Sequence, residues 1–182
     1  LPVWDGELYL EYHRGTYTSQ AAVKRANRKA EILYHNAEWL ASLADILTGS
    51  VAYPVQDLNA GWERILLNQF HDILPGSSIH PVYEDTLKEF EGVTEIGDRV
   101  VDQAAEMLAE HAPITDGVMV MNSLFWQRDD LMEVPLDAGH TGKTLQSPDG
   151  TPLVSQRVET AEGSVLLVNV TGVPSLGYKA LS

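Results

Sequence analysis

The residues best suited to carry out chemistry are an adjacent histidine and aspartate, His71 and Asp72, in the segment LLNQFHDILPGSS at 66–78. The pair follows an apolar run with helical spacing and precedes a Pro-Gly turn. A neutral imidazole nitrogen binds zinc, and a neighbouring carboxylate accepts hydrogen bonds from a polar ligand. The two side chains can therefore serve a metal ion and a substrate together.

Spacing alone leaves a second interpretation of this pair open, because a His-Asp pair at a helix end is commonly a capping or surface arrangement. The adjacent Ser77 and Ser78 do not form a G-x-S-x-G elbow, so a turn is favoured over a seryl nucleophile. The sequence has no cysteine. Any zinc site must therefore use His, Asp or Glu ligands.

Helical periodicity surrounds the pair. Apolar residues recur every three or four positions along three stretches joined by short connections, which predicts an antiparallel three-helix bundle. Ser19 is interpreted as the first N-cap, and Gly92 and Gly97 are expected to cost the third helix some stability. The predicted helices extend from Ser19 to about Leu47, from Leu58 to near Asp72, and from Pro81 to Leu108.

After Pro113 the pattern changes to short apolar runs, such as GVMVMN, LMEVP and SVLLVNV, which are typical of strands. The predicted fold class is therefore α+β: the bundle is followed by an incomplete antiparallel β-sheet or sandwich domain. The expected divisions are residues 1–17 as a linker from an absent domain, 18–112 as the three-helix domain, and 113–182 as the start of the β-domain.

Composition narrows the class of partner. Hydrophobic residues make up 44% and charged residues 21% of the chain, a balance typical of globular proteins. The formal net charge of -14 opposes binding to nucleic acid or to an anionic membrane surface. No apolar run approaches the roughly 20 residues that span a bilayer. We therefore expect neither a nucleic-acid partner nor a membrane partner.

The residues around His71 resemble a known enzyme family. The segment NQFHDILPGSSI resembles the part of glycoside hydrolase family 38 α-mannosidases that delivers a histidine to the catalytic zinc from the helical domain. Residues 7–31, with a G-x-Y-T-S core, resemble the family stretch that links the catalytic barrel to the first bundle helix. Residues 120–135 and 172–181 resemble pieces of the family's β-domain, so the resemblance spans nearly the entire chain.

This resemblance implies a zinc-dependent retaining α-mannosidase that hydrolyses terminal α-D-mannosidic bonds of glycans. It implies that His71 is a zinc ligand, that Asp72 faces the sugar, and that His13 lines the substrate groove. The nucleophile, the acid/base and the remaining zinc ligands are expected in a catalytic domain that this chain lacks. The expected cofactor is Zn²⁺, the expected partners are α-mannoside glycans and that missing domain, and the chain alone is expected to be inactive.

A stand-alone module that binds carbohydrate or protein is the alternative function. It explains the acidic surface equally well, but it does not explain why the His-Asp pair and its flanking segments match one enzyme family in the same order. The first residue, Leu1, suggests a piece of a longer protein. The lack of cysteine and the single glycosylation sequon at Asn169 favour a cytoplasmic parent enzyme.

Overall fold

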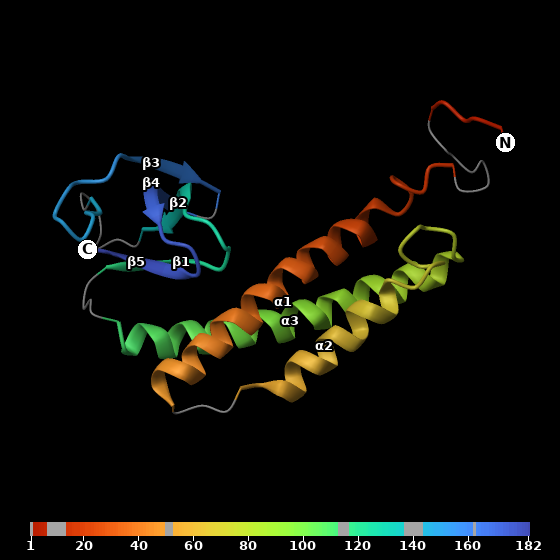
Figure 1. Ribbon diagram of the computed structural model, residues 1–182, viewed down its shortest axis with the longest axis horizontal. Coiled ribbons are helices and arrows are strands. Elements are labelled where there is room, and N and C mark those ends of the chain that lie inside the picture. Colours follow the sequence, from red (N-terminus) through yellow and green to blue (C-terminus); the bar gives the residue numbers. More distant parts are fainter. Residues whose placement is uncertain (1, 7–13, 50–52, 113–116, 137–143, 162) are drawn as a thin grey trace. The chain divides into compact units, whose positions relative to one another are not determined.

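The computed structural model describes residues 2–6, 14–49, 53–112, 117–136, 144–161 and 163–182. The chain divides into two compact units, residues 1–105 and residues 106–182. Helices precede strands, which confirms the predicted α+β class (Figure 1). The elements are α1 (Ala21–Thr48), α2 (Val55–Asn68), α3 (His80–Glu110), β1 (Val118–Asn122), β2 (Arg128–Pro135), β3 (Ser155–Thr160), β4 (Gly163–Val173) and β5 (Gly177–Leu181).

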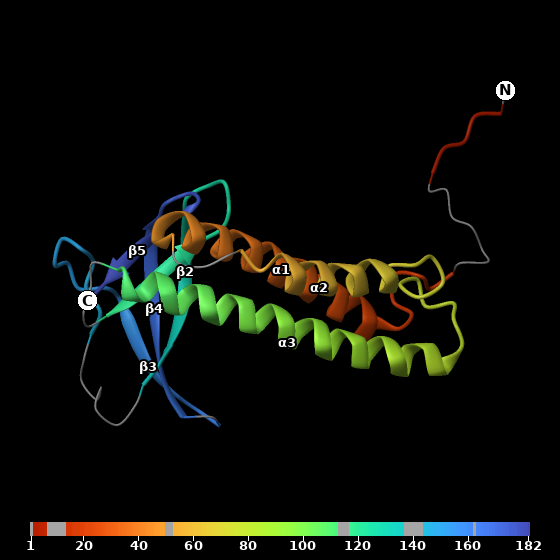
Figure 2. The same ribbon diagram turned by 90° about the horizontal axis from the view of Figure 1, so that it is seen from below.

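The three helices alternate in direction, so that α2 runs antiparallel to α1 and α3 runs antiparallel to α2 (Figure 2). Two contacts agree with this arrangement. Lys24, near the start of α1, donates a hydrogen bond to the carbonyl of Leu74, just after the end of α2. Arg99 in α3 forms an ion pair of 3.0 Å with Asp57 at the start of α2. The predicted antiparallel bundle is confirmed.

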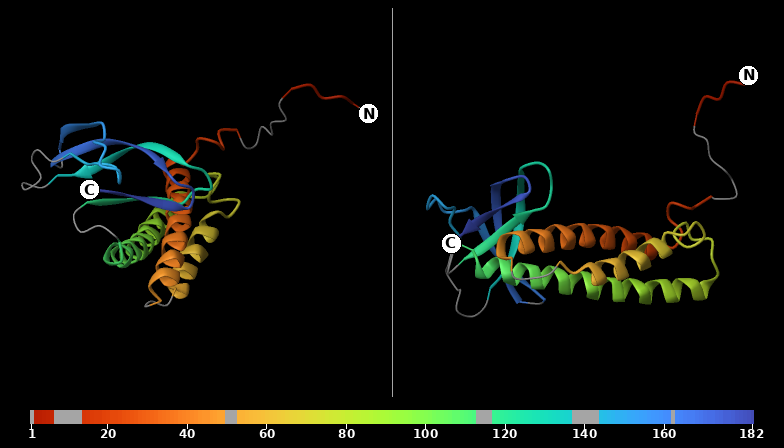
Figure 3. Two further views of the ribbon diagram at one scale, coloured as in Figure 1. Left: turned by 60° about the vertical axis from the view of Figure 1, so that its left-hand side comes forward. Right: turned by 60° about the horizontal axis from the view of Figure 1, so that its bottom comes forward.

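Each helix buries one apolar stripe, because residues three and four positions apart lie on the same helical face. Both views of Figure 3 show the helices side by side, which allows the three stripes to share one core. The bundle core contains Val23, Ala30, Tyr34, Ala37, Ala41, Leu58, Ile65, Tyr83, Phe90, Val93 and Val100.

Tyr34 connects all three helices at the middle of the bundle. Its side chain is fully buried, and its hydroxyl donates a hydrogen bond of 3.0 Å to the carbonyl of Val93 in α3. In α2, a Cβ added to Gly61 would lie 1.7 Å from the Tyr34 hydroxyl oxygen. Only a glycine leaves room for the ring at this point. Burial raises the pKa of Tyr34 to about 12.

The two glycines inside α3 differ in what surrounds them. A Cβ on Gly97 would lie 2.6 Å from the Leu33 side chain, so this glycine permits close packing of α3 on α1. A Cβ on Gly92 would meet the end of the flexible Arg64 side chain at 2.8 Å. The helical cost that the sequence predicts therefore has a packing reason at Gly97 but a much weaker one at Gly92.

The start of α1 differs from the expected capping by Ser19. The helix begins at Ala21, and the cap position is occupied by Gln20, which has a left-handed backbone (φ 51°) and no side-chain capping hydrogen bond. Ser19 instead offers its carbonyl oxygen to the Lys24 ammonium group. At the other end of α1, Gly49 adopts φ 59° and its N–H binds the carbonyl of Asp45, as is usual for a glycine that ends a helix.

The second unit contains two small antiparallel sheets. One pairs β1 with β5, and the other has the strand order β2-β4-β3. The long β4 lies in the centre of the larger sheet, and its alternating residues Leu166, Val168 and Val170 are buried. Together with Val173 and Leu181 they form the core of this unit.

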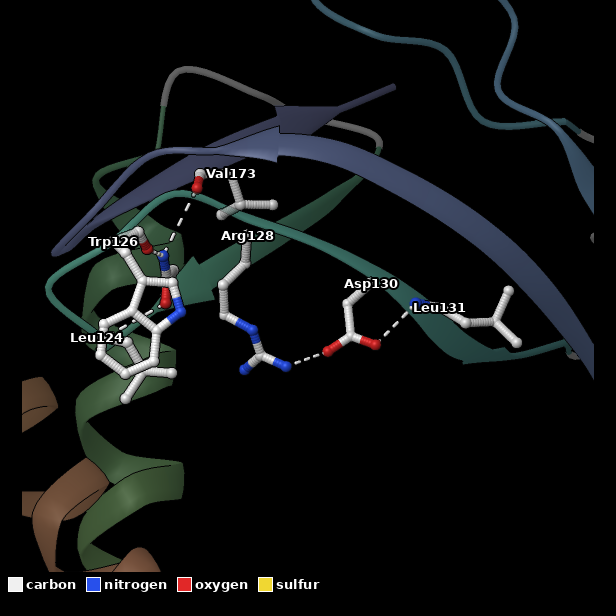
Figure 4. A network of polar contacts seen from close by, with 7 residues as sticks. Leu124, Trp126, Arg128, Asp130, Leu131 and Val173 are labelled. Atoms are coloured by element: carbon white, nitrogen blue, oxygen red, sulfur yellow. Dashed lines mark hydrogen bonds and ion pairs between the residues drawn. The ribbon is translucent and has the colours of Figure 1, made fainter.

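Asn122 fastens the loops at one end of these strands. Its side chain is buried, and its amide donates to the carbonyls of Trp126 at 2.7 Å and Pro174 at 3.0 Å. Its oxygen accepts the N–H of Leu124 at 3.1 Å. The amide also donates to the carbonyl of Val173 at 3.4 Å, and Figure 4 shows Leu124, Trp126 and Val173 of this network beside the exposed Arg128. A buried amide with all of these partners fixes the loop between β1 and β2.

Within the described ranges, none of the helices combines the length and the apolar character that crossing a membrane requires.

Candidate functional site

The candidate site lies on the turn between α2 and α3, which we call the His71 turn (residues 69–79). The sequence suggests that the second helix continues to near Asp72, but α2 ends at Asn68. The N–H of Phe70 binds the carbonyl of Leu67, three residues earlier, so the helix tightens into turns. Gly76, with φ 96°, completes the reversal. The pair therefore lies on irregular backbone and not on a helix.

His71 and Asp72 lie side by side and face solvent. His71 Nε2 is 3.4 Å from Asp72 Oδ2, and the two side chains are 76% and 58% exposed. The imidazole packs on the ring of Phe70, with centroids 4.1 Å apart. Because 3.4 Å is longer than a strong charge-assisted hydrogen bond, this contact leaves both groups available to a ligand.

Asp72 is held by the serines that follow it. Ser77 Oγ donates to Asp72 Oδ1 at 3.2 Å, and Ser78 Oγ donates to the carbonyl of Asp72. The N–H of Ser78 in turn donates to the Tyr83 hydroxyl of α3 at 2.6 Å. Both serine hydroxyls therefore orient the turn, which agrees with the turn interpretation of the Pro-Gly-Ser-Ser segment.

A partly buried polar network ties the beginning of the His71 turn to α1. Gln69 Nε2 donates to Asn27 Oδ1 and to Glu31 Oε1, both at 3.0 Å. Asn27 Nδ2 also donates to Glu31 Oε1 at 3.0 Å. Because Gln69 lies two residues before His71, these bonds limit the movement of the backbone that carries the imidazole.

The end of the His71 turn is tied to the beginning of α1. Lys24 Nζ donates to the carbonyls of Leu74 at 2.9 Å and Pro75 at 3.3 Å. A Cβ on Gly76 would lie 2.8 Å from Ser19 Cβ, so the turn packs directly on the residues that enter α1. Tyr83 of α3 accepts a hydrogen bond from the N–H of Ser78 in the same turn. The turn is therefore held by α1 and α3 as well as by α2, which precedes it.

The sequence identifies His71 and Asp72 but not the residues that hold them in place. Asn27 is a polar residue within the buried stripe of α1, and such an exception is the one signal that could have indicated a network. The roles of Lys24 and Gln69 could not be found from a local pattern, because their hydrogen-bond partners lie about 40 to 50 residues away in sequence. His13, expected in a substrate groove, lies outside the described residues.

The fit to a metal ion is partial. Among the residues that the structure describes, no three His, Asp or Glu side chains lie close enough together to hold a metal. Zinc sites in proteins use three or four protein ligands. An exposed imidazole such as His71 fits one ligand of a site that other residues complete.

Exposed apolar side chains lie near the pair in sequence, at the end of α2 and in the His71 turn. Leu66, Leu67, Phe70 and Ile79 are each more than half exposed. Four large apolar residues close together in sequence, on the end of a helix and the turn after it, are unusual for a surface that faces water. They give the His71 turn the character of a contact surface.

Comparison with protein families matches residues 11–108 to the alpha mannosidase middle domain. The match covers more than half of the chain and includes α1, α2 and the His71 turn. The chain therefore belongs to the α-mannosidase family, and the matched segment is the middle domain of that family.

Individual relatives agree with this family. Alpha-mannosidase 2C1 of Homo sapiens is 35% identical over an alignment that covers 93% of this chain and 18% of the human protein. The alpha-mannosidase of Saccharomyces cerevisiae is 34% identical, with 95% of this chain and 16% of the yeast protein covered. The chain thus spans less than a fifth of the length of these two relatives.

Solved structures share the fold. The crystal structure of an alpha-mannosidase from Enterococcus faecalis superposes with a TM-score of 0.70 at 19% identity. The match covers 93% of this chain and 24% of the Enterococcus faecalis chain. A glycosyl hydrolase family 38 protein from the same organism has a TM-score of 0.68 at 20% identity, and covers 100% of this chain and 26% of that chain. At these identities the likeness concerns the fold.

Proposed function

We propose that this chain is part of a zinc-dependent retaining α-mannosidase that hydrolyses terminal α-D-mannosidic bonds of glycans. One observation carries the proposal: an exposed His-Asp pair, His71 and Asp72, lies on a turn held by all three helices, inside the segment that matches the family's middle domain. These contacts hold the imidazole in a defined place, which suits a metal ligand. The names of the relatives support the substrate class.

In this proposal, each residue of the site has one role. His71 contributes a neutral ring nitrogen as one zinc ligand. Asp72 accepts hydrogen bonds from sugar hydroxyls, and the Ser77 hydroxyl bonded to its Oδ1 keeps the carboxylate in place. His13 lines the substrate groove. Zinc, when bound, supplies a Lewis acid and a template for the hydroxyls of the sugar.

The remaining machinery belongs to other parts of the enzyme. A retaining glycosidase needs a carboxylate nucleophile and a second carboxyl group that acts as acid and then as base. We assign neither to this chain, and we propose that the isolated chain does not hydrolyse mannosides. The exposed apolar residues of α2 and the His71 turn support a contact surface for the catalytic domain. We place the enzyme in the cytoplasm.

The test is the activity of the full-length enzyme that contains this sequence. We expect it to release the aryl group from an aryl α-D-mannoside when zinc is present. His71→Ala should remove most of this activity together with bound zinc. The matched control is His80→Ala, because His80 is also an exposed histidine, lies 3.6 Å from the surface carboxylate of Glu84, and has no role in the proposed site.

Three outcomes separate the hypotheses. Loss of zinc and activity in His71→Ala but not in His80→Ala supports the proposal. Wild-type activity and zinc content in His71→Ala would show that His71 is a surface residue of the turn. If the wild-type enzyme hydrolyses no α-mannoside, a module that binds carbohydrate or protein becomes the better explanation.

A further inference from the structure

Lys24 makes contacts that neither the sequence motif nor the proposed chemistry uses. Its ammonium group is partly buried and donates to three backbone carbonyls, those of Ser19, Leu74 and Pro75. A lysine ammonium has three protons to donate, so these bonds use its full capacity. Two of the acceptors belong to the His71 turn, and the third belongs to the residues that enter α1.

The location of Lys24 is unfavourable for the stability of α1. It is the fourth residue of that helix, and α1 has no acidic residue in its first turn. A positive charge close to a helix N-terminus opposes the macrodipole, so a lysine here does not stabilise the helix itself. Burial also lowers the pKa of Lys24, which is a further cost of holding the charge there. Its contacts with the turn are the compensating gain.

The contacts link two segments that pack very closely. The backbone of Gly76 lies against Ser19, where an added Cβ would approach Ser19 Cβ to 2.8 Å. Leu74, whose carbonyl Lys24 binds, packs its side chain on the bundle core. Lys24 therefore acts at the point where the turn meets α1. The packing of Leu74 on the core and the close approach of Gly76 to Ser19 restrict the position of the turn at the same place.

We propose that Lys24 is a positioning residue for His71: its ammonium group fastens the His71 turn to the start of α1 and so sets where the imidazole stands. This inference rests on the proposed function, because positioning matters only if His71 is a metal ligand. It acts through the backbone, since Lys24 contacts the turn at Leu74 and Pro75 and not at the imidazole. Loss of the hydrogen bonds from the Lys24 ammonium group should weaken zinc binding and leave the bundle folded.

The test uses Lys24→Met in the full-length enzyme. Methionine retains the apolar stem and is a good helix former, so the full-length enzyme should keep its wild-type circular dichroism spectrum and unfolding temperature. Zinc affinity, measured by competition with a chelating dye, should fall by about tenfold or more, as is typical when a supporting contact of a metal ligand is lost. Lys24→Arg, which retains the charge and the donors, should lie between wild type and Lys24→Met.

Two further variants keep the result decisive. Lys29→Met removes an exposed lysine from the same helix and should leave zinc affinity unchanged. Gly76→Ala displaces the same turn from Ser19 with Lys24 intact, and should also weaken zinc binding; it replaces Lys24→Met if that variant does not fold. Wild-type zinc affinity in a folded Lys24→Met overturns the inference, provided that His71→Ala loses zinc. If Lys24→Met does not fold, wild-type zinc affinity in Gly76→Ala overturns it. Wild-type affinity in His71→Ala overturns the proposed function instead.

Discussion

At the scale of single residues, the two members of the His-Asp pair have different surroundings. The ring of His71 rests on Phe70 and faces outward, which suits a ligand for an ion held by other residues. Asp72 has one carboxylate oxygen engaged by Ser77, and the other lies 3.4 Å from the imidazole. Substitution of His71 and substitution of Asp72 are therefore expected to have different effects on zinc binding and on activity.

Asp72→Asn is expected to lower kcat/KM for an aryl α-D-mannoside by about tenfold to a hundredfold, because a hydrogen bond to a charged group contributes about 1.5–3 kcal/mol. Zinc content, measured by atomic absorption, should stay at the wild-type level, because the amide still occupies the same place on the turn. Loss of zinc in this variant would show instead that Asp72 helps to hold the metal ion.

Tyr34→Phe tests the buried hydroxyl at the centre of the bundle. The free energy of unfolding of the variant should be about 1 kcal/mol lower than that of the wild type near neutral pH, because the hydrogen bond to the Val93 carbonyl is lost. The pKa of Tyr34 rises from 10.0 to about 12 on folding. The unfolded chain therefore releases this proton first, so the contribution of Tyr34 is complete below pH 10 and is lost as the pH rises toward 12.

Urea unfolding of the wild type and Tyr34→Phe between pH 8 and about 11.5 measures this contribution, since other titrating groups cancel in the comparison. The difference in unfolding free energy between the two proteins should shrink above pH 10. A difference that stays constant over this range would contradict a buried, neutral Tyr34.

At the scale of elements, the bundle depends on glycines at the points where helices approach most closely. Gly61→Ala places a methyl group where the buried Tyr34 ring already stands, and should cost about 1–3 kcal/mol or more of unfolding free energy. Gly92→Ala is the matched control. There the methyl group meets only the end of Arg64, and the gain in helix propensity is about 1 kcal/mol.

Guanidinium unfolding followed by circular dichroism should therefore show a lower midpoint for Gly61→Ala and an equal or higher midpoint for Gly92→Ala. Equal destabilisation by both substitutions would contradict this account, because it would mean that the contact with Tyr34 does not set Gly61 apart from Gly92.

The elements themselves follow largely from the sequence. Three- and four-residue spacing predicts all three helices, and the apolar runs predict β1, β2 and β4. The runs do not predict β3, because its sequence SQRVET is mostly polar and it forms an edge of the larger sheet. The end of α2 is also missed, since its apolar pattern continues through Phe70 into the turn that follows.

The site follows from the sequence only in part. His71 and Asp72 are visible as neighbours in a recognisable segment, and the structure keeps them together. Lys24, Asn27 and Gln69 are not visible, because their contacts join segments about 40 to 50 residues apart and become apparent only when α1 and α2 lie side by side. Local patterns identify reactive side chains, and tertiary packing identifies the residues that hold them.

At the scale of the whole molecule, the chain carries one candidate metal ligand on a well-supported turn, and it spans less than a fifth of the length of its human and yeast relatives. An imidazole alone does not make a zinc site. The proposed function therefore requires that His71 act together with residues outside this chain, in an enzyme that contains it.

The most direct test of this requirement is the zinc dissociation constant of the full-length enzyme, compared between wild type, His71→Ala and His80→Ala by competition with a chelator. Loss of a supporting contact typically weakens metal binding by about 10–100-fold, so loss of the direct ligand His71 should raise the constant by at least about a hundredfold. His80→Ala should match the wild type. A His71→Ala enzyme that binds zinc as tightly as the wild type would contradict the assignment of His71 as a metal ligand.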